Sequence, residues 1–119
     1  MRVMTFNIRF ENDRDGDNGW VHRRDQATGL IVACSPWILG TQEGTPNQLQ
    51  YLGERLPGYA MHALGRPPED TTCQYPTLFY HAQHLELVDG AEFWLSTTPW
   101  VHRSKDWDSA FPRMMNYAL

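Results

Sequence analysis

The segments MTFNIR (Met4–Arg9) and ILGTQE (Ile38–Glu43) decide the fold of this chain. Each is a short apolar run that ends in polar residues, and this pattern predicts a buried strand whose last residues reach the rim of a sheet. The first strand brings the amide of Asn7 to that rim, and the second brings the carboxylate of Glu43. Because α/β proteins carry their chemistry at this edge, Asn7 and Glu43 are the first candidates for a functional site.

The sequence around these segments predicts a β-α-β-α-β beginning. Alternation predicts a strand over Arg2–Ile8, and a continuous apolar run predicts a buried strand over Trp37–Gln42. Apolar residues spaced by three and four predict an amphipathic helix over Val21–Cys34, after a polar loop at Glu11–Gly19. A second helix has the clearest signals, since Thr45 can cap it, Pro46 suits its first position and Gln48 completes a capping box. Its buried stripe is Leu49, Leu52 and Leu56.

The second half of the chain is expected to be mainly antiparallel. Tyr59–Leu64 predicts a strand and Gly65–Thr72 a surface loop. Three further strands form a predicted meander in which Asp89-Gly90 is the turn; they are Thr77–His81, Glu86–Val88 and Ala91–Leu95. After a loop over Ser96–Ala110, Pro112–Leu119 begins a last strand. The expected architecture is α/β, with a mixed sheet and helices on one face.

In this order, the two opening segments resemble the first two signatures of the endonuclease/exonuclease/phosphatase family. FWLSTTP (Phe93–Pro99) and SAFPR (Ser109–Arg113) are similar to later blocks of the same family. Members hydrolyse phosphoester bonds with a divalent metal, usually magnesium. The family's other signatures, a strand ending in histidine, a Gly-Asp-x-Asn turn and a terminal Asp-His pair, do not occur in these 119 residues.

The resemblance therefore implies that residues 1–119 are one unit, the N-terminal half of such a domain. Its implied fold is α/β of the α+β type, half of a four-layered α/β/β/α sandwich in which two halves pack sheet against sheet. The implied function is metal-dependent phosphoester hydrolysis, as a phosphatase or phosphodiesterase. Because the second half would supply the general base, we expect this chain alone to be inactive.

The resemblance also implies roles for individual residues. Glu43 would be a catalytic metal ligand for Mg²⁺ or Mn²⁺, and magnesium needs few carboxylates because it keeps several waters. Asn7 would be catalytic and would help to hold the metal or to orient its water or a phosphate oxygen. Arg113 and Arg9 are the candidate substrate-binding residues, since arginine pairs well with phosphate. From the residues alone, a loop start, a turn cap and surface ion pairs remain alternative explanations.

Some positions depart from the family pattern. Thr97 stands where glutamate is usual, and Gln74 stands where an acidic residue is common. Both changes remove carboxylates near the expected cleft, so they affect the expected substrate contacts more than the metal site. Asn116 and Tyr117 replace a more usual threonine and tryptophan.

Composition favours a small substrate over a nucleic acid. The net charge is −4, and the longest basic cluster is His22–Arg24. Tight binding to a duplex depends on many cationic contacts to phosphates, so a small phosphorylated substrate fits better. No apolar run is long enough for a membrane span and no signal peptide is apparent, which predicts a cytoplasmic protein without a membrane partner. Cys34 and Cys73 are isolated and are expected to be free thiols.

A second hypothesis treats the chain as a non-catalytic fragment that binds a phosphate ligand, a metal or a protein. The sheet of a half-domain leaves an edge and a face exposed, so self-association is expected. Asp13–Asp17 alternates carboxylates around a glycine but lacks the spacing of an EF-hand, and a solvated turn is the preferred interpretation. Trp100 and Trp107 are predicted in a loop, where they would line a cleft or pack at its rim.

Overall fold

A computed structural model describes all residues from 1 to 119. Along the chain the elements are β1 (Val3–Asn7), the 3₁₀ helix η1 (Asp13–Asn18), α1 (Trp20–Cys34), β2 (Ile38–Gly44), α2 (Pro46–Arg55), β3 (Tyr59–His62), β4 (Tyr75–His81), β5 (Gly90–Trp94) and β6 (Met114–Ala118). The β-α-β-α-β beginning predicted from the sequence is confirmed.

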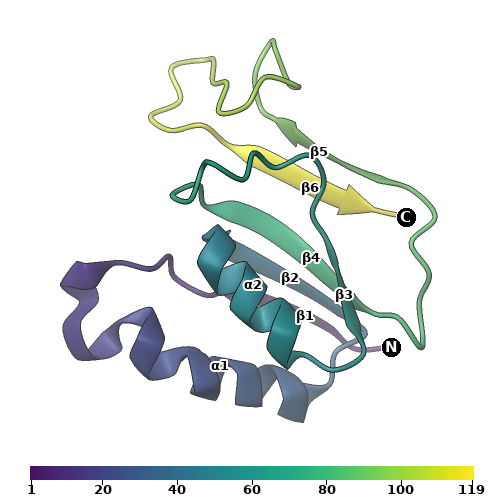
Figure 1. Ribbon diagram of the computed structural model, residues 1–119. Coiled ribbons are helices and arrows are strands. Elements are labelled where there is room, and N and C mark those ends of the chain that lie inside the picture. The colour runs from purple at the N-terminus through teal and green to yellow at the C-terminus, as the bar shows by residue number, and fades with distance from the viewer.

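The strands form one mixed sheet and one separate pair. The four-stranded sheet has the order β1-β2-β4-β3, and β5 pairs with β6. β1 runs parallel to β2, with α1 as the crossover that a parallel pair requires. β4 runs antiparallel to both of its neighbours. Figure 1 shows the β5–β6 pair next to β4. β6 contacts β4, so the pair lies beside the four-stranded sheet.

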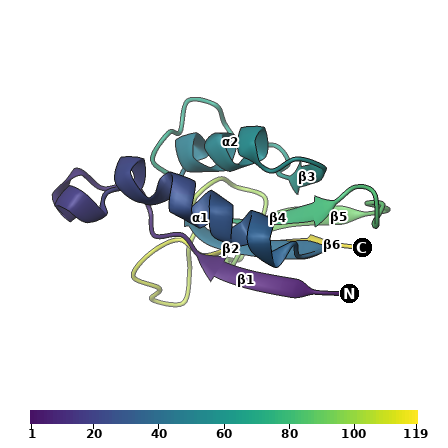
Figure 2. The same ribbon diagram turned by 90° about the horizontal axis from the view of Figure 1, so that it is seen from below.

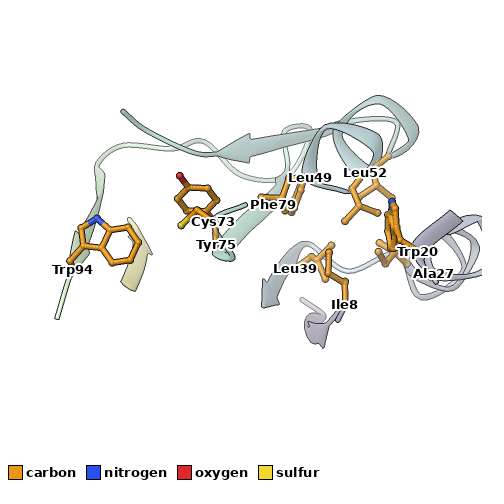
Figure 3. Close-up of a cluster of buried hydrophobic side chains, with 12 residues drawn as sticks. Ile8, Trp20, Ala27, Leu39, Leu49, Leu52, Cys73, Tyr75, Phe79 and Trp94 are labelled. Atoms are coloured by element: carbon orange, nitrogen blue, oxygen red, sulfur yellow. The ribbon is translucent and has the colours of Figure 1, made fainter. Parts of the chain in front are cut away.

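Both helices cover the same face of the four-stranded sheet. Figure 2 shows α1 and α2 over this face. Ile31 of α1, Leu52 of α2, and Leu39 and Phe79 of the sheet have no exposed area. They belong to a cluster of 12 buried hydrophobic residues that extends to Trp94 in β5, as Figure 3 shows. The core therefore lies between the helices and the sheet and continues to the β5–β6 pair.

The opposite face of the sheet, here called the outer face, has no covering element in this chain. Met4 and Phe6 of β1 pack against the core, whereas Val3, Thr5 and Asn7, which alternate with them, are exposed. Val3 is 61% exposed. The alternation along β1 thus places an uncovered, partly apolar surface beside Asn7.

The predicted meander is wrong in its middle part. Glu86–Val88 is not a strand, because both edges of β4 are already occupied by β2 and β3. The segment instead leads to β5, and the Val88 N–H donates to the carbonyl of Leu119 at 2.8 Å. The predicted turn residue Gly90 is the first residue of β5, where a Cβ would come within 2.7 Å of the His62 ring. Close packing against His62, rather than a tight turn, explains this glycine.

Smaller differences concern the loops. The polar loop predicted over Glu11–Gly19 contains the helix η1, which Asn12 caps by accepting a hydrogen bond from the Arg14 N–H. The predicted capping box of α2 is present, since the Thr45 N–H donates to Gln48 Oε1 at 3.1 Å. No helix in the structure combines the length and the apolarity needed to cross a bilayer.

Candidate active site

Asn7 and Glu43 come together at the carboxyl ends of β1 and β2. Asn7 is the last residue of β1 and lies opposite Gln42 in the parallel register. Its Nδ2 donates to Glu43 Oε1 at 2.9 Å, and the Phe10 N–H donates to Glu43 Oε2 at 3.3 Å. Both carboxylate oxygens of Glu43 are therefore held in place. The two side chains that the sequence pattern placed at the rim of the sheet are therefore in contact.

The backbone of β2 is irregular where it presents Glu43. The register of β2 against β4 shifts between Thr41 and Gly44, as in a β-bulge. Glu43 has φ of 64°, in the left-handed region that costs a non-glycine residue about 1 kcal/mol. A bulge re-aims the side chain that it carries, and bulges are frequent beside active sites. Gly44 follows because a Cβ there would lie 2.6 Å from the side chain of Leu49.

Two buried or half-buried side chains fix the loop after β1. Gln48 of α2 has no exposed area; its Nε2 donates to the Arg9 carbonyl at 2.9 Å, and its Oε1 accepts from the Glu11 N–H at 3.1 Å. Arg23 of α1 donates to the carbonyls of Ile8 and Arg9. Both helices thus hold the loop that directly follows Asn7. This loop helps to fix Asn7, which in turn donates to Glu43.

We expect Gln48→Leu to lower the free energy of unfolding by about 1 to 3 kcal/mol, because the N–H groups of Glu11 and Thr45 lose their acceptor. Urea denaturation followed by circular dichroism measures this change. Gln50→Leu is the matched control, since Gln50 lies on the same helix but is exposed. Equal denaturation midpoints for the two variants would contradict the role of Gln48.

A cleft of about 680 Å³ opens beside the Asn7–Glu43 pair. Its charged and amide-bearing lining residues are Asn7, Gln42, Glu43, Gln74, Arg103 and Arg113. The carboxylate of Glu43 and the guanidinium groups of Arg103 and Arg113 line this space. Arg103 is paired with the Asp70 carboxylate, so Arg113 is the guanidinium of the cleft that has no ion-pair partner. Arg113 suits an anionic ligand, and a cation bound at Glu43 would add to its attraction.

The predicted residues divide between the cleft and its surroundings. Arg113 lines the cleft with Glu43. Arg9 does not: its guanidinium binds Asp15, with Nη2 to Oδ1 at 3.1 Å, and packs over the Phe10 ring. The Arg9 guanidinium lowers the pKa of the Asp15 carboxyl. Substrate binding by Arg9 stays a prediction, and it would require the ion pair with Asp15 to open.

The oxygen chemistry of the pair fits a hard cation. Glu43 offers a carboxylate at a solvent-accessible cleft, and Mg²⁺ is commonly held by one or two carboxylates together with water. The amide of Asn7 presents its nitrogen to Glu43, while its Oδ1 accepts from the Arg9 N–H at 2.8 Å. In this arrangement Asn7 orients the carboxylate of Glu43. Direct metal binding by Asn7 stays a prediction.

A buried ion pair behind the cleft was missed by the sequence reasoning. Arg66, from the β3–β4 connection, donates from Nε to Glu92 Oε2 of β5 at 3.0 Å, and Glu92 is only 4% exposed. Arg66 also donates to Thr77 Oγ1 of β4 at 3.0 Å. The amide of Asn116, one of the departures from the family pattern, donates to Glu92 and to the His62 carbonyl. These contacts join the four-stranded sheet to the β5–β6 pair.

Thr97, another departure from the family pattern, has a local partner. Its backbone N–H donates to Asp106 Oδ2 at 2.6 Å, and its hydroxyl donates to the same oxygen. These bonds lower the pKa of the Asp106 carboxyl, chiefly through the Thr97 hydroxyl. Thr97 therefore closes the loop after β5 and does not line the cleft with Gln74.

Solved structures with this fold exist. An endonuclease/exonuclease/phosphatase from Bacteroides vulgatus superposes with a TM-score of 0.90 at 35% sequence identity, covering 98% of this chain and 45% of that chain. The mannosyl-6-phosphatase Bt3783 from Bacteroides thetaiotaomicron VPI-5482 superposes with a TM-score of 0.87 at 32% identity, covering 99% of this chain and 45% of that chain. No protein-family model and no curated protein matches the sequence.

These similarities confirm the resemblance drawn from the two opening segments. The chain has the fold of the endonuclease/exonuclease/phosphatase family, with a mixed four-stranded sheet and two helices. At the level of the family, its neighbours are phosphoester hydrolases, and one of them is a phosphatase. The chain spans less than half the length of these two relatives.

Proposed function

We propose that this chain is the N-terminal half of a divalent-metal-dependent phosphoester hydrolase that acts on a small phosphorylated substrate. The observation that carries the proposal is the carboxylate of Glu43, held by Asn7 and by the Phe10 N–H at a cleft that also presents two arginines. The similarity to the Bacteroides thetaiotaomicron mannosyl-6-phosphatase, which covers nearly the whole of this chain, supports it.

In this proposal each residue of the cleft has a separate role. Glu43 is the anchor for Mg²⁺ or Mn²⁺, an ion that would neutralise charge on the phosphoryl oxygens. Asn7 keeps the Glu43 carboxylate in one orientation through its 2.9 Å hydrogen bond. Arg113 binds the phosphate by charge-assisted hydrogen bonds. The general base and the remaining metal ligands come from the other half of the domain, which packs against the outer face.

The substrate class follows from the charges and the size of the site. Glu43, Arg103 and Arg113 are the charged residues that line the cleft, so few phosphates can be neutralised at once. Its volume of about 680 Å³ lies within the usual range of small-molecule sites. A phosphorylated sugar or a similar small ester fits this description better than a duplex.

We expect the complete hydrolase to turn over small phosphoesters faster than duplex DNA, because a cleft with two arginines makes few of the phosphate contacts that duplex binding requires. Steady-state rates on chromogenic and sugar phosphoesters and on plasmid DNA, measured at one salt concentration with Mg²⁺, decide the question. Faster cleavage of the plasmid would exclude this substrate class while leaving the hydrolase assignment intact.

A second candidate function is a binding role without catalysis. The exposed residue Val3, on the same face of β1 as Asn7, favours it, because uncovered apolar surface often marks an interaction site. A phosphate ligand or a protein would then be bound without turnover. Metal-dependent turnover by the protein that contains this chain, lost in Glu43→Gln, would exclude this alternative.

A further inference from the structure

A second cluster of metal-ligating side chains borders the same cleft through Cys73. Asp70 and Cys73 belong to the β3–β4 connection, and His102 belongs to the β5–β6 connection. One donor atom from each residue lies within 4.8 Å of the other two. Cys73 is 4% exposed, and the side chain of Asp70 is 15% exposed. Neither the Asn7–Glu43 pair nor the proposed hydrolysis uses these three residues.

We propose that Asp70, Cys73 and His102 bind Zn²⁺, with water as the fourth ligand. A thiolate, an imidazole and a carboxylate form a ligand set that suits this borderline-soft ion, whereas Mg²⁺ takes oxygen ligands. Zinc–ligand bonds of about 2.0 to 2.3 Å place two ligands roughly 3 to 4 Å apart. Zinc binding would therefore move the His102 imidazole and the Asp70 carboxylate slightly apart, since their nearest atoms are 2.7 Å apart, and would bring the more distant donor atoms, which lie within 4.8 Å of one another, closer together.

The turn that carries two of the ligands is already ordered. Asp70 Oδ1 accepts from the N–H groups of Thr72 and Cys73, at 3.2 and 3.1 Å, which fixes the carboxylate beside the thiol. His102 comes from the other connection, and its Nε2 lies 2.7 Å from Asp70 Oδ2. The Trp94 ring packs nearly perpendicular to the imidazole, with ring centroids 5.3 Å apart. Three ligands are thus positioned by two loops and one strand.

Arg103 competes for the same carboxylate. Its Nε and Nη2 donate to the two oxygens of Asp70 at 2.6 and 2.7 Å, and this pairing holds the pKa of the Asp70 carboxyl far below its usual range. The carboxylate thus already binds one cationic group, the guanidinium of Arg103. A bound Zn²⁺ would displace and repel the guanidinium, so the metal and Arg103 would be alternatives at this point.

Binding also requires the Cys73 thiol to lose its proton. Zinc binds a cysteine as the thiolate, so an ion bound at Cys73 displaces the thiol proton to the solvent. The carboxylate and the thiolate then balance the two charges of the ion. Because Cys73 and Arg103 line the cleft next to Glu43, a bound Zn²⁺ would tie the two connections together and change one wall of that cleft.

The test uses Co²⁺ as a spectroscopic substitute for Zn²⁺ on the 119-residue chain. We expect a thiolate-to-cobalt charge-transfer band that saturates at one ion per chain and disappears when Zn²⁺ is added. Cys73→Ser should abolish the band, and His102→Gln should weaken binding by more than about tenfold, since even outer-shell losses cost that much. Arg103→Gln should tighten binding by removing the competing cation.

Two controls separate this site from others in the chain. Cys34→Ser removes the other thiol, and Glu43→Gln removes the proposed magnesium anchor; both variants should keep the band. Absence of the band in the native chain, or its survival in Cys73→Ser with loss in Cys34→Ser, would overturn the proposal. Weaker binding by a folded Arg103→Gln chain would equally contradict it, because the guanidinium would then support the ion rather than compete with it.

Discussion

Glu92→Gln is expected to lower the free energy of unfolding by about 3 to 5 kcal/mol, because removing one member of a buried ion pair leaves the other charge uncompensated. The side chain of Glu92 is 4% exposed and receives hydrogen bonds from Arg66 and Asn116. Without its carboxylate, the Arg66 guanidinium stays 14% exposed beside the Tyr75 ring. The contact between the four-stranded sheet and the β5–β6 pair would weaken with it.

Urea denaturation followed by tryptophan fluorescence measures the effect, and Trp94 at the end of β5 is a suitable probe of this region. Glu86→Gln is the matched control, since Glu86 is exposed on the neighbouring connection. The double variant Arg66→Met with Glu92→Leu should recover part of the stability. Replacing both members of a buried ion pair with apolar residues often leaves the free energy of unfolding unchanged or raises it. A shift no larger than that of Glu86→Gln would show that the pair is not needed to hold the sheets together.

The 119-residue chain alone is expected to show no metal-dependent phosphoester turnover and to self-associate. Rate accelerations of 10⁶-fold or more, a typical order for enzymes, need a complete set of catalytic groups, and the cleft here presents a single carboxylate. Val3 at 61% and Met115 at 46% exposure leave apolar surface for contacts between copies. Light scattering and a phosphodiesterase assay on the same sample measure both properties.

The matched variants are Val3→Lys and Met115→Lys, which should shift the scattering mass toward the monomer without unfolding the chain. Thr5→Lys, on the same face of β1, is a third position for the same purpose. A monomeric native chain whose metal-dependent rate is lost in Glu43→Ala would be a complete enzyme. The proposed division of the active site between two halves would then be wrong.

The sequence predicted the parts of the fold that depend on local pattern. Alternation and capping signals located β1, both helices and the strand that ends at Glu43, because hydrophobic periodicity and helix caps act within a few residues. The rim position of Asn7 and Glu43 followed from the same pattern and is confirmed by their 2.9 Å contact. Their chemical roles were assigned by the family resemblance and not by the pattern.

Contacts between distant segments could not be predicted in this way. The Arg66–Glu92 pair joins residues 26 positions apart, and neither residue carries a motif. The pairing of β5 with β6 depends on both edges of β4 being occupied, which is a property of the assembled sheet. Arg103 was missed as a cleft residue because its position depends on its bond to Asp70, 33 residues earlier.

The most direct test of the central claim is the affinity of the 119-residue chain for Mg²⁺ and Mn²⁺, measured by titration calorimetry for the native chain, Glu43→Gln and Glu54→Gln. Glu54 is an exposed carboxylate on α2, remote from the lining of the cleft. If Glu43 anchors the catalytic metal, Glu43→Gln should lose measurable binding, because magnesium depends on few protein carboxylates, and Glu54→Gln should bind like the native chain. Equal affinities in all three proteins would contradict the assignment of Glu43 as the metal anchor.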